Sequence, residues 1–150
     1  MAESIFKNKT VWITGASSGI GKELAIQLAA KGAHLILSAR REAELQQGQA
    51  ACSSPEEHRV LRLDMLDSEA MQQAVVDVVA NGGVDMLVNN ADISQRSQAL
   101  ETALEVDRKV MELDYFSQIA LTKLVLPSMV ERGSGYVLAV ASVAGKLGAP

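Results

Sequence analysis

TGASSGIG, residues 14–21, is the stretch that decides the fold of this 150-residue chain. It follows a short apolar segment, residues 10–13, and leads into a helical pattern over residues 20–31. A glycine-rich turn between a strand and a helix is typical of a loop that holds phosphate groups at a helix N-terminus, where backbone N–H groups and the helix dipole favour an anion. The stretch therefore predicts a nucleotide-binding α/β fold.

Each of the three glycines has its own expected role. Gly15 would allow a sharp turn off the strand, and Gly19 would let the backbone come close to a pyrophosphate. Gly21 would let the new helix pack tightly against the sheet. Ser17 and Ser18 add hydroxyl donors to the loop. The alternative is a glycine-rich turn that binds no ligand.

Apolar strand segments alternate with helical patterns along the whole chain, which is typical of a parallel sheet built from right-handed crossovers. The predicted strands are residues 10–13, 34–38, 60–63, 84–89 and 136–141. The predicted helices are residues 20–31, 41–52, 68–81 and 104–132. We therefore expect residues 1–150 to form one α/β domain, a Rossmann-type doubly wound parallel sheet with helices on both faces.

Two helix starts and one proline give local predictions. Asp67 is expected to cap the third helix, and residues 102–105 have the form of a capping box before the fourth. Pro127 has no N–H group, so the fourth helix should kink or lose its regular hydrogen bonds over residues 123–127.

The fourth helix has more apolar surface than one sheet can cover, which implies a second partner. One apolar face consists of Val106, Val110, Leu113, Ala120 and Leu124, and another of Met111, Tyr115, Ile119 and Leu126.

The spacing of the glycines differs from the common G-x-G-x-x-G fingerprint. Three residues separate Gly15 from Gly19 and one separates Gly19 from Gly21, with Thr14 ahead and Ile20 inside. In this arrangement the chain resembles the short-chain dehydrogenase/reductase family over essentially its whole length. The resemblance implies the strand order 3-2-1-4-5, with the fold truncated after strand five. It also implies a cofactor crevice at the carboxyl ends of strands one and four, and a cofactor contact for Ile20.

Arg40 and Arg41 follow the second predicted strand, where an acidic residue would accept hydrogen bonds from the adenosine ribose of NAD. A guanidinium can instead bind the extra phosphate of NADP through charge-assisted hydrogen bonds. The sequence therefore favours NADP over NAD. The alternative is a pair of solvated arginines at the start of a surface helix.

Asp64 and Met65 end the third strand and resemble the family's adenine site. The resemblance implies that the Asp64 carboxylate accepts from the adenine amine and that the Met65 N–H group meets the ring. The alternative is an aspartate that stabilises a turn.

Asn89-Asn90-Ala91-Asp92 ends the fourth strand and resembles the family's N-N-A-G segment, in which the second Asn ties neighbouring strands together beside the cofactor. Asn90 and Ala91 are therefore cofactor-site candidates. Asp92 stands where the family has glycine, which puts a carboxylate near the expected ribose and phosphates and should lower cofactor affinity.

Ser142, at the end of strand five, matches the serine that in the family hydrogen-bonds the substrate carbonyl. Asp114 and Ser117 stand where a similar segment of the family has Asn and Gly. The Asn belongs to the family's proton relay, so Asp114 is a catalytic candidate that could hold a relay water as an ionisable group.

The family's chemistry also needs a tyrosine acid assisted by a lysine in Tyr-x-x-x-Lys. Neither Tyr115 nor Tyr136 is followed four residues later by lysine, and by resemblance the pair would follow Pro150. We therefore expect an NADP-dependent oxidoreductase acting on an alcohol or carbonyl substrate, of which these 150 residues alone bind nucleotide and turn over little. The alternative is a non-catalytic nucleotide-binding or interaction fragment.

Composition sets further expectations. A formal charge of −4 argues against nucleic-acid or membrane-surface binding. Cys52 is the only cysteine, no Cys/His cluster has metal-ligand spacing, and no apolar run is long enough to span a membrane, so we expect a cytoplasmic protein without a metal. Self-association through the helix at 104–132 or the edge of the fifth strand would give a homo-oligomer.

Overall fold

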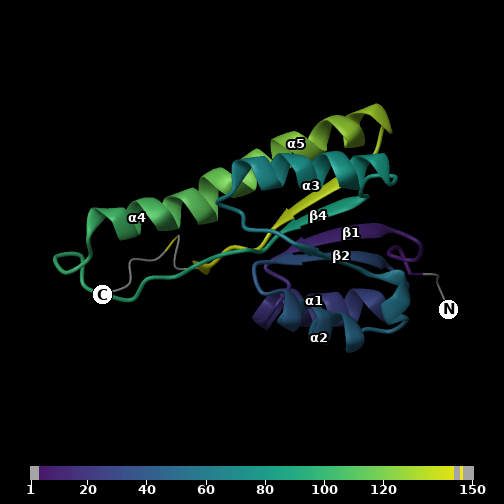
Figure 1. Ribbon diagram of the computed structural model, residues 1–150, viewed down its shortest axis with the longest axis horizontal. Coiled ribbons are helices and arrows are strands. Elements are labelled where there is room, and N and C mark those ends of the chain that lie inside the picture. The colour runs from purple at the N-terminus through teal and green to yellow at the C-terminus, as the bar shows by residue number, and fades with distance from the viewer. Residues whose placement is uncertain (1–3, 144–145, 147–150) are drawn as a thin grey trace.

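The computed structural model describes residues 4–143 and 146, in which five parallel strands form one sheet of order β3-β2-β1-β4-β5. Helices α1 and α2 cover one face of the sheet and α3 and α5 cover the other, while α4 projects beyond the sheet in line with α5 (Figure 1). The predicted Rossmann-type fold and strand order are thereby confirmed. The strands are β1 (Thr10–Thr14), β2 (His34–Ala39), β3 (Arg59–Arg62), β4 (Met86–Asn89) and β5 (Tyr136–Ala139).

Alternating side chains of the central strands divide the core into two halves. Trp12 and Leu87 point into the half beneath α3 and α5, while Val11, Ile13 and Val88 point into the half above α1 and α2. Because both faces of β1 are covered, its residues 11–14 are completely buried. This explains why the strand before the glycine turn is apolar throughout instead of alternating.

The first three helices lie close to their predicted ranges. They are α1 (Gly19–Ala29), α2 (Glu42–Ala50) and α3 (Ser68–Ala80), and a short 3-10 helix, η1 (Pro55–Glu57), precedes β3. The side chain of Asp67 accepts from the backbone N–H of Ala70 at 2.9 Å, so the predicted cap on α3 is confirmed. Cys52, just after α2, is buried and its thiol donates to the carbonyl of Gly48.

The predicted helix over residues 104–132 consists of three segments, and its irregular part lies elsewhere than expected. They are α4 (Leu104–Met111), the π-helix η2 (Glu112–Ser117) and α5 (Gln118–Glu131). The helix continues through Pro127 and does not end there, although Pro127 itself has no N–H group to donate within the helix. A π-helical turn contains extra backbone, so it rotates the residues after it relative to an ideal helix. Consequently the buried residues from η2 onward are Leu113, Ser117, Leu121, Val125 and Met129 instead of the predicted stripe through Ala120 and Leu124.

The predicted capping box at residues 102–105 was also wrong. Helix α4 begins one residue later than the motif requires, with Ala103 at the N-cap and no side-chain cap. The hydroxyl of Thr102 instead donates to the carbonyl of Gln98 at 3.0 Å. The Thr102 side chain therefore stabilises the turn before α4 instead of capping the helix.

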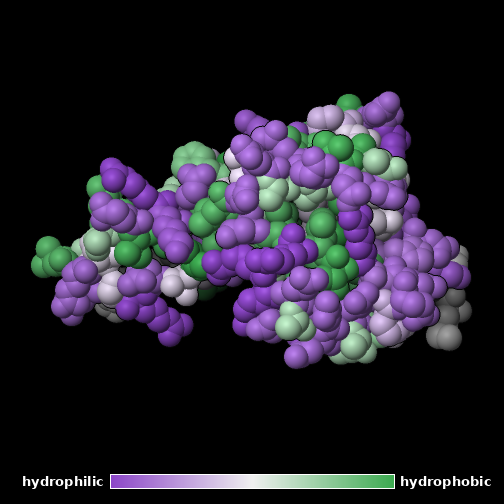
Figure 2. Space-filling view, viewed as in Figure 1, coloured by the Kyte–Doolittle hydropathy of each residue, from purple (hydrophilic) through white to green (hydrophobic). Residues whose placement is uncertain are grey.

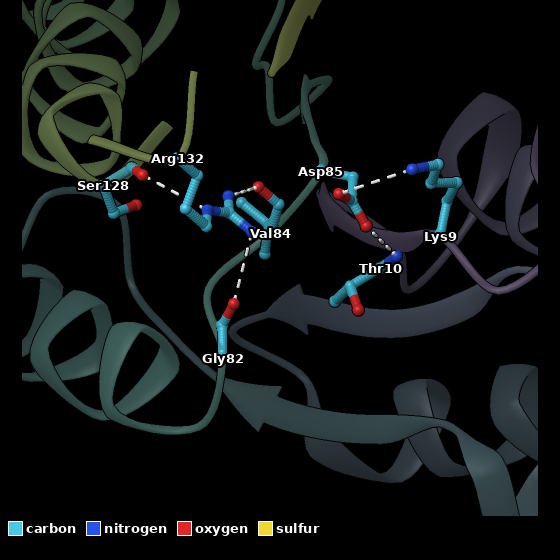
Figure 3. Close-up of polar contacts among 7 residues, drawn as sticks. All are labelled: Lys9, Thr10, Gly82, Val84, Asp85, Ser128 and Arg132. Carbon is cyan, nitrogen blue, oxygen red and sulfur yellow. Dashed lines mark hydrogen bonds and ion pairs between the residues drawn. The ribbon is translucent and has the colours of Figure 1, made fainter. Parts of the chain in front are cut away.

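At the amino ends of the strands, Arg132 and Asp85 fix the connections between layers (Figure 3). The Arg132 guanidinium donates to the carbonyls of Gly82 and Val84, in the turn between α3 and β4. Asp85 accepts from the backbone N–H of Thr10 at 2.9 Å and lies 3.9 Å from the ammonium of Lys9. These contacts close the edge of the sheet opposite to the glycine turn.

Candidate functional site

A cleft of about 1210 Å³ lies at the carboxyl ends of the strands. In Figure 2 the surface is hollowed between the projecting α4 segment at left and the α1–α2 layer. All five strands contribute lining residues from their carboxyl ends or from the loops that follow. The cleft brings together every site residue predicted from the sequence except Gly21, which is buried in the helix start behind it: Gly15, Ser17, Ser18, Gly19, Ile20, Arg40, Arg41, Asp64, Met65, Asn90, Ala91, Asp114 and Ser142.

The three glycines of the turn meet different surroundings. A Cβ atom on Gly15 would lie 2.8 Å from Cα of Ala91, and one on Gly21 would lie 2.5 Å from the carbonyl oxygen of Gly15. Gly19 has φ +55° and open space where its Cβ would be. Protein packing therefore requires glycine at 15 and 21, while at 19 the backbone faces the cleft with nothing in between.

The first turn of α1 directs unsatisfied backbone groups at this space. Ser18 is the N-cap residue, yet its side chain makes no cap hydrogen bond, and no acidic residue lies in the first turn. The first N–H groups of a helix lack partners within the helix, and the dipole makes that end positive. The cleft thus has, beside Gly19, a helix terminus whose N–H groups and dipole favour an anion.

Thr14 and Asn90 join the glycine turn to the end of β4. The buried hydroxyl of Thr14 accepts from the backbone N–H groups of Asn90 and Ala91, at 3.0 and 3.1 Å. In return the Asn90 amide donates to the carbonyls of Thr14 and Gly15, at 3.0 and 3.2 Å. The contact that the resemblance implied for the second Asn is therefore present, tying β1 to β4 beside the cleft.

The two arginines after β2 are placed differently. Arg41 donates to the hydroxyls of Ser17 and Ser18, each at 3.2 Å, and to the carboxylate of Glu44 at 3.3 Å. Arg40 also lines the cleft but has no hydrogen bond or ion pair with any described residue. Both side chains could contribute positive charge at the α2 side of the cleft.

Asp64 both stabilises a turn and lines the cleft. One carboxylate oxygen accepts from the backbone N–H of Leu66 at 3.0 Å, which is the turn arrangement given as the alternative for this residue. Leu63 and Met65, on either side, line the same wall. The other carboxylate oxygen has no donor among the described residues. Asp64 could therefore stabilise the turn and accept from an adenine amine at the same time.

Asp114 projects from the π-helix into the cleft and accepts from the backbone N–H of Ile93 at 2.9 Å. Burial raises the pKa of the Asp114 carboxyl above its ordinary value, and the nearby Asp92 carboxylate raises it further, while the hydrogen bond from Ile93 opposes both. The family's asparagine would make the same backbone contact without a charge. Asp114 therefore makes the contact that an asparagine could make and adds a titratable charge to the cleft.

Ser117 and Ser142 differ in burial: Ser117 is buried, whereas Ser142 is exposed. Ser117, where the similar segment has glycine, is buried and its hydroxyl donates to the carbonyl of Leu113 at 2.7 Å, inside the π-helix. Ser142 follows β5 and is exposed at the cleft. Ser142 therefore lies where a substrate could reach it, whereas Ser117 has a structural hydrogen bond.

Sequence reasoning missed Gln118 and Thr122, which support the end of β4 from α5. Gln118 donates to the carbonyl of Ala91 at 2.8 Å, and Thr122 accepts from the Asn89 amide at 2.9 Å. The other Asn89 side-chain atom, its carbonyl oxygen, is buried beside the cleft without a partner in the described residues. Two polar residues four positions apart in a largely apolar helix were the signal, because this spacing puts both on one face.

The described part of the chain contains neither a candidate metal site nor a helix that could cross a membrane. Among those residues, no group of three or more His, Cys, Asp or Glu side chains is arranged to hold a metal ion. Within the same residues, no helix has the length and apolar character needed to cross a membrane.

Comparison with known families and proteins gives one consistent result. A family model described as short chain dehydrogenase matches residues 9–150. The chain is 44% identical over 146 residues to human dehydrogenase/reductase SDR family member 7, covering 93% of this chain and 43% of that protein. It is 40% identical over 155 aligned positions to mouse dehydrogenase/reductase SDR family member 7B, covering 99% and 48%. The chain thus spans about half the length of the curated relatives it matches.

Solved structures show the same architecture. A short-chain dehydrogenase from Streptomyces avermitilis has a TM-score of 0.88 at 39% identity, with 94% of this chain and 52% of that chain covered. A 7α-hydroxysteroid dehydrogenase, solved with NADH and 7-oxo glycochenodeoxycholic acid, has a TM-score of 0.90 at 28% identity, with 98% and 58% covered. The cleft described above therefore belongs to a fold shared with dehydrogenases.

Proposed function

This chain belongs to the short-chain dehydrogenase family, and we propose that it is the NADP(H)-binding part of an oxidoreductase that acts on an alcohol or carbonyl substrate. Membership of the family implies a nicotinamide nucleotide cofactor. The choice of NADP, the substrate class and the roles of individual residues are the further content of the proposal.

The observation that best supports the proposal is the open glycine turn at the start of α1. Gly19 faces the cleft with no atom where a Cβ would be, and the first turn of α1 has neither a side-chain cap nor an acidic residue. A pyrophosphate placed there would accept from backbone N–H groups and meet the positive end of the helix dipole. The residues present therefore fit a dinucleotide.

The preference for NADP rests on the charges after β2. Arg40 and Arg41 line the cleft at this point, and the segment from β2 into the first residue of α2 has its only acid, Glu42, beyond both arginines. A guanidinium beside the adenosine ribose would bind the additional phosphate of NADP, and hydrogen bonds to charged groups contribute about 1.5–3 kcal/mol each. NAD lacks that phosphate and gains nothing from the arginines.

The bound cofactor would supply or accept the hydride, and the chain's own residues would orient the reacting groups. In the proposed reaction the Ser142 hydroxyl donates a hydrogen bond to the substrate carbonyl oxygen. Asp114, held by the Ile93 N–H, stands in the position of the family's relay asparagine. No Tyr-x-x-x-Lys occurs within these 150 residues, so the proposal for this chain by itself is nucleotide binding with little or no turnover.

Calorimetric titration with NADPH and NADH tests the cofactor assignment. We expect saturable binding that is tighter for NADPH, and Arg40→Ala should remove most of that preference while leaving NADH binding unchanged. Tighter binding of NADH, unaffected by Arg40→Ala, would overturn the NADP assignment. No binding of either nucleotide by a chain that melts cooperatively would overturn the nucleotide site itself.

A second candidate function is a binding or interaction module without catalysis. Asp92 and Asp114 favour it, because they stand where the resembling segments have glycine and the relay asparagine, and the loss of these residues would accompany a loss of catalysis. Both candidates predict NADPH binding, but only the oxidoreductase allows the chain to oxidise NADPH with a substrate. NADPH oxidation with a panel of ketones, abolished by Ser142→Ala, would support catalysis by this chain and exclude the module.

Assembly and location are also part of the proposal. Met111, Tyr115 and Leu126 are exposed on the long helix, and every residue of β5 is exposed, so either surface could pair with a second copy. Sedimentation at increasing concentration tests a homo-oligomer. The proposed cytoplasmic location is supported by the lone Cys52, which can form no disulfide within the chain, and cell fractionation tests it.

A further inference from the structure

We propose that Glu44 is a specificity-determining residue, which lowers the affinity of the cleft for a 2′-phosphorylated nucleotide by competing for Arg41. The inference rests on the proposed function, because it concerns the phosphate that distinguishes NADP from NAD. It adds a residue outside the cleft lining that acts through a single contact.

The contacts of the two arginines differ, and Glu44 accounts for part of the difference. Glu44 accepts from Nη1 of Arg41 at 3.3 Å, while Nη2 of the same guanidinium donates to Ser17 and Ser18. Arg40, its neighbour, has no partner among the described residues. A phosphate entering the cleft therefore meets one arginine that is unengaged and one that is already hydrogen-bonded on both terminal nitrogens.

The Ser17 and Ser18 hydroxyls and the Glu44 carboxylate would respond differently to a phosphate. A hydroxyl can rotate and donate to the phosphate itself, so Ser17 and Ser18 need not oppose binding. Glu44 is acceptor-only when ionised, and its negative charge repels the phosphate while it neutralises Arg41. Binding through Arg41 therefore requires either the loss of this ion pair or two anions sharing one guanidinium.

The solvent exposure of the pair limits the size of the effect. The Arg41 and Glu44 side chains are 56% and 38% exposed. Exposed ion pairs are screened by water and salt and contribute little, which corresponds to an affinity change of about two- to five-fold. Glu44 would thus adjust the preference for NADP, while the arginines create it.

Glu42 provides a matched control within the same helical turn. It has the same charge as Glu44 and also lies in the first turn of α2, but its side chain makes no hydrogen bond or ion pair with a described residue. Glu42→Gln therefore removes the same unit of charge from the same helix end without releasing Arg41. Any difference between the two variants reports the contact itself.

The test is a titration of the 150-residue chain and its variants with 2′,5′-ADP, NADP and NAD. Glu44→Gln should bind 2′,5′-ADP and NADP about two- to five-fold more tightly than the wild type, with NAD affinity unchanged and the gain reduced at high salt. Glu42→Gln should show less than half of that gain. In an Arg41→Met background, Glu44→Gln should give no larger gain than Glu42→Gln, because the competition needs both partners and only the repulsion by the charge remains.

Three results would overturn the inference: equal effects of Glu44→Gln and Glu42→Gln, weaker binding by Glu44→Gln, or a full gain by Glu44→Gln in the absence of Arg41. Weaker binding would mean that Glu44 orients Arg41 for the phosphate instead of competing for it. These results are distinct from a failure of the proposed function. In that case the wild type would bind none of the three nucleotides although its melt is cooperative.

Discussion

Helices α1 and α3 both begin at the carboxyl edge of the sheet, yet their first turns are built in opposite ways. In α3 the Asp67 side chain accepts from Ala70 N–H, and Glu69 adds a negative charge to the first turn. In α1 the Ser18 side chain makes no cap hydrogen bond and the first turn has no acidic residue. Both helices have the same set of unpaired N–H groups at this end.

The difference separates a terminus built for stability from one left open for a ligand. Helix α3 satisfies its end within the chain, which stabilises the fold whether or not anything binds. Helix α1 leaves its N–H groups facing the cleft, beside the space at Gly19. Changes at α1 should therefore act on nucleotide affinity, and changes at the α3 cap on unfolding alone.

Gly21→Ala should have the largest effect, because it damages the α1 terminus through packing. The new Cβ would lie 2.5 Å from both the Asn90 amide nitrogen and the Gly15 carbonyl oxygen. We expect a loss of about 1–3 kcal/mol in the free energy of unfolding, together with most of the NADP affinity. Denaturant titration and calorimetry measure the two quantities.

Gly48→Ala is the matched control for that variant. Gly48 lies inside α2, where a Cβ would find nothing closer than 3.8 Å. Alanine in a helix interior should stabilise the protein by about 0.5–1 kcal/mol and leave NADP binding unchanged. A Gly21→Ala protein as stable as Gly48→Ala would contradict the packing argument.

Ser18→Asp would give α1 the acidic cap that α3 has. The carboxylate would satisfy first-turn N–H groups and could raise the free energy of unfolding by up to about 1 kcal/mol. The same charge would repel the nucleotide phosphates, so NADP affinity should fall about ten-fold or more. Ser18→Ala removes the hydroxyl without adding charge and should reduce affinity much less. An Asp variant that binds like the Ala variant would show that the phosphates lie elsewhere.

Asp67→Ala removes the cap from α3. We expect a loss of about 0.5–2 kcal/mol in the free energy of unfolding, since the Ala70 N–H loses its acceptor, with no change in NADP affinity. Urea denaturation and nucleotide titration of the same preparation test both parts. If the NADP affinity of the variant falls by more than its unfolded fraction accounts for, the ends of α1 and α3 are coupled.

Asp114→Asn should have the smallest effect, and its sign is the reverse of that for Asp67. The folded protein raises the pKa of Asp114, so between the ordinary pKa and the raised one the folded state binds more protons than the unfolded state. This contribution to stability is greatest at low pH and falls as the pH rises through that window. Asn keeps an acceptor for the Ile93 N–H and carries no charge.

The variant should therefore be more stable than the wild type at pH 7, with the difference shrinking as the pH falls toward the ordinary carboxyl pKa of 3.8. Denaturant titrations at pH 4 and pH 7 measure it. Asp92→Asn, which removes the secondary cause of the shift, should give a smaller change. A stability difference independent of pH would contradict the assignment.

The sheet and the cleft could be predicted because their signals are local. Glycine spacing predicted the β1–α1 turn, the alternating strand and helix segments predicted a parallel sheet, and the order of its strands came from the family resemblance that the glycine spacing indicated. The cleft residues then followed, since the carboxyl ends of parallel strands meet at one edge. Arg40 was found from its charge and its place after a strand, whereas Asp64 and Ser142 were found through the family resemblance, and all three line the cleft.

The sequence did not predict features in which two local hydrogen-bonding arrangements have similar energies, or in which a partner lies far along the chain. The Thr102 hydroxyl could cap a helix or bond to Gln98, and tertiary geometry decided for the latter. The π-helical turn at Glu112–Ser117 has no marker as strong as proline, so the irregularity was expected at Pro127. Gln118 escaped notice because its role depends on the Ala91 carbonyl, 27 residues away.

The Thr14 hydroxyl has a consequence for the entropy of binding. It accepts from two N–H groups and donates to the carbonyl of Val88, at 3.3 Å, so the last residue of β1 and the first residues after β4 are fixed to each other. The ordering of this part of the cleft is completed when the protein folds. If a nucleotide binds in the cleft, its binding free energy is therefore not reduced by the cost of ordering the end of β1 and the residues after β4.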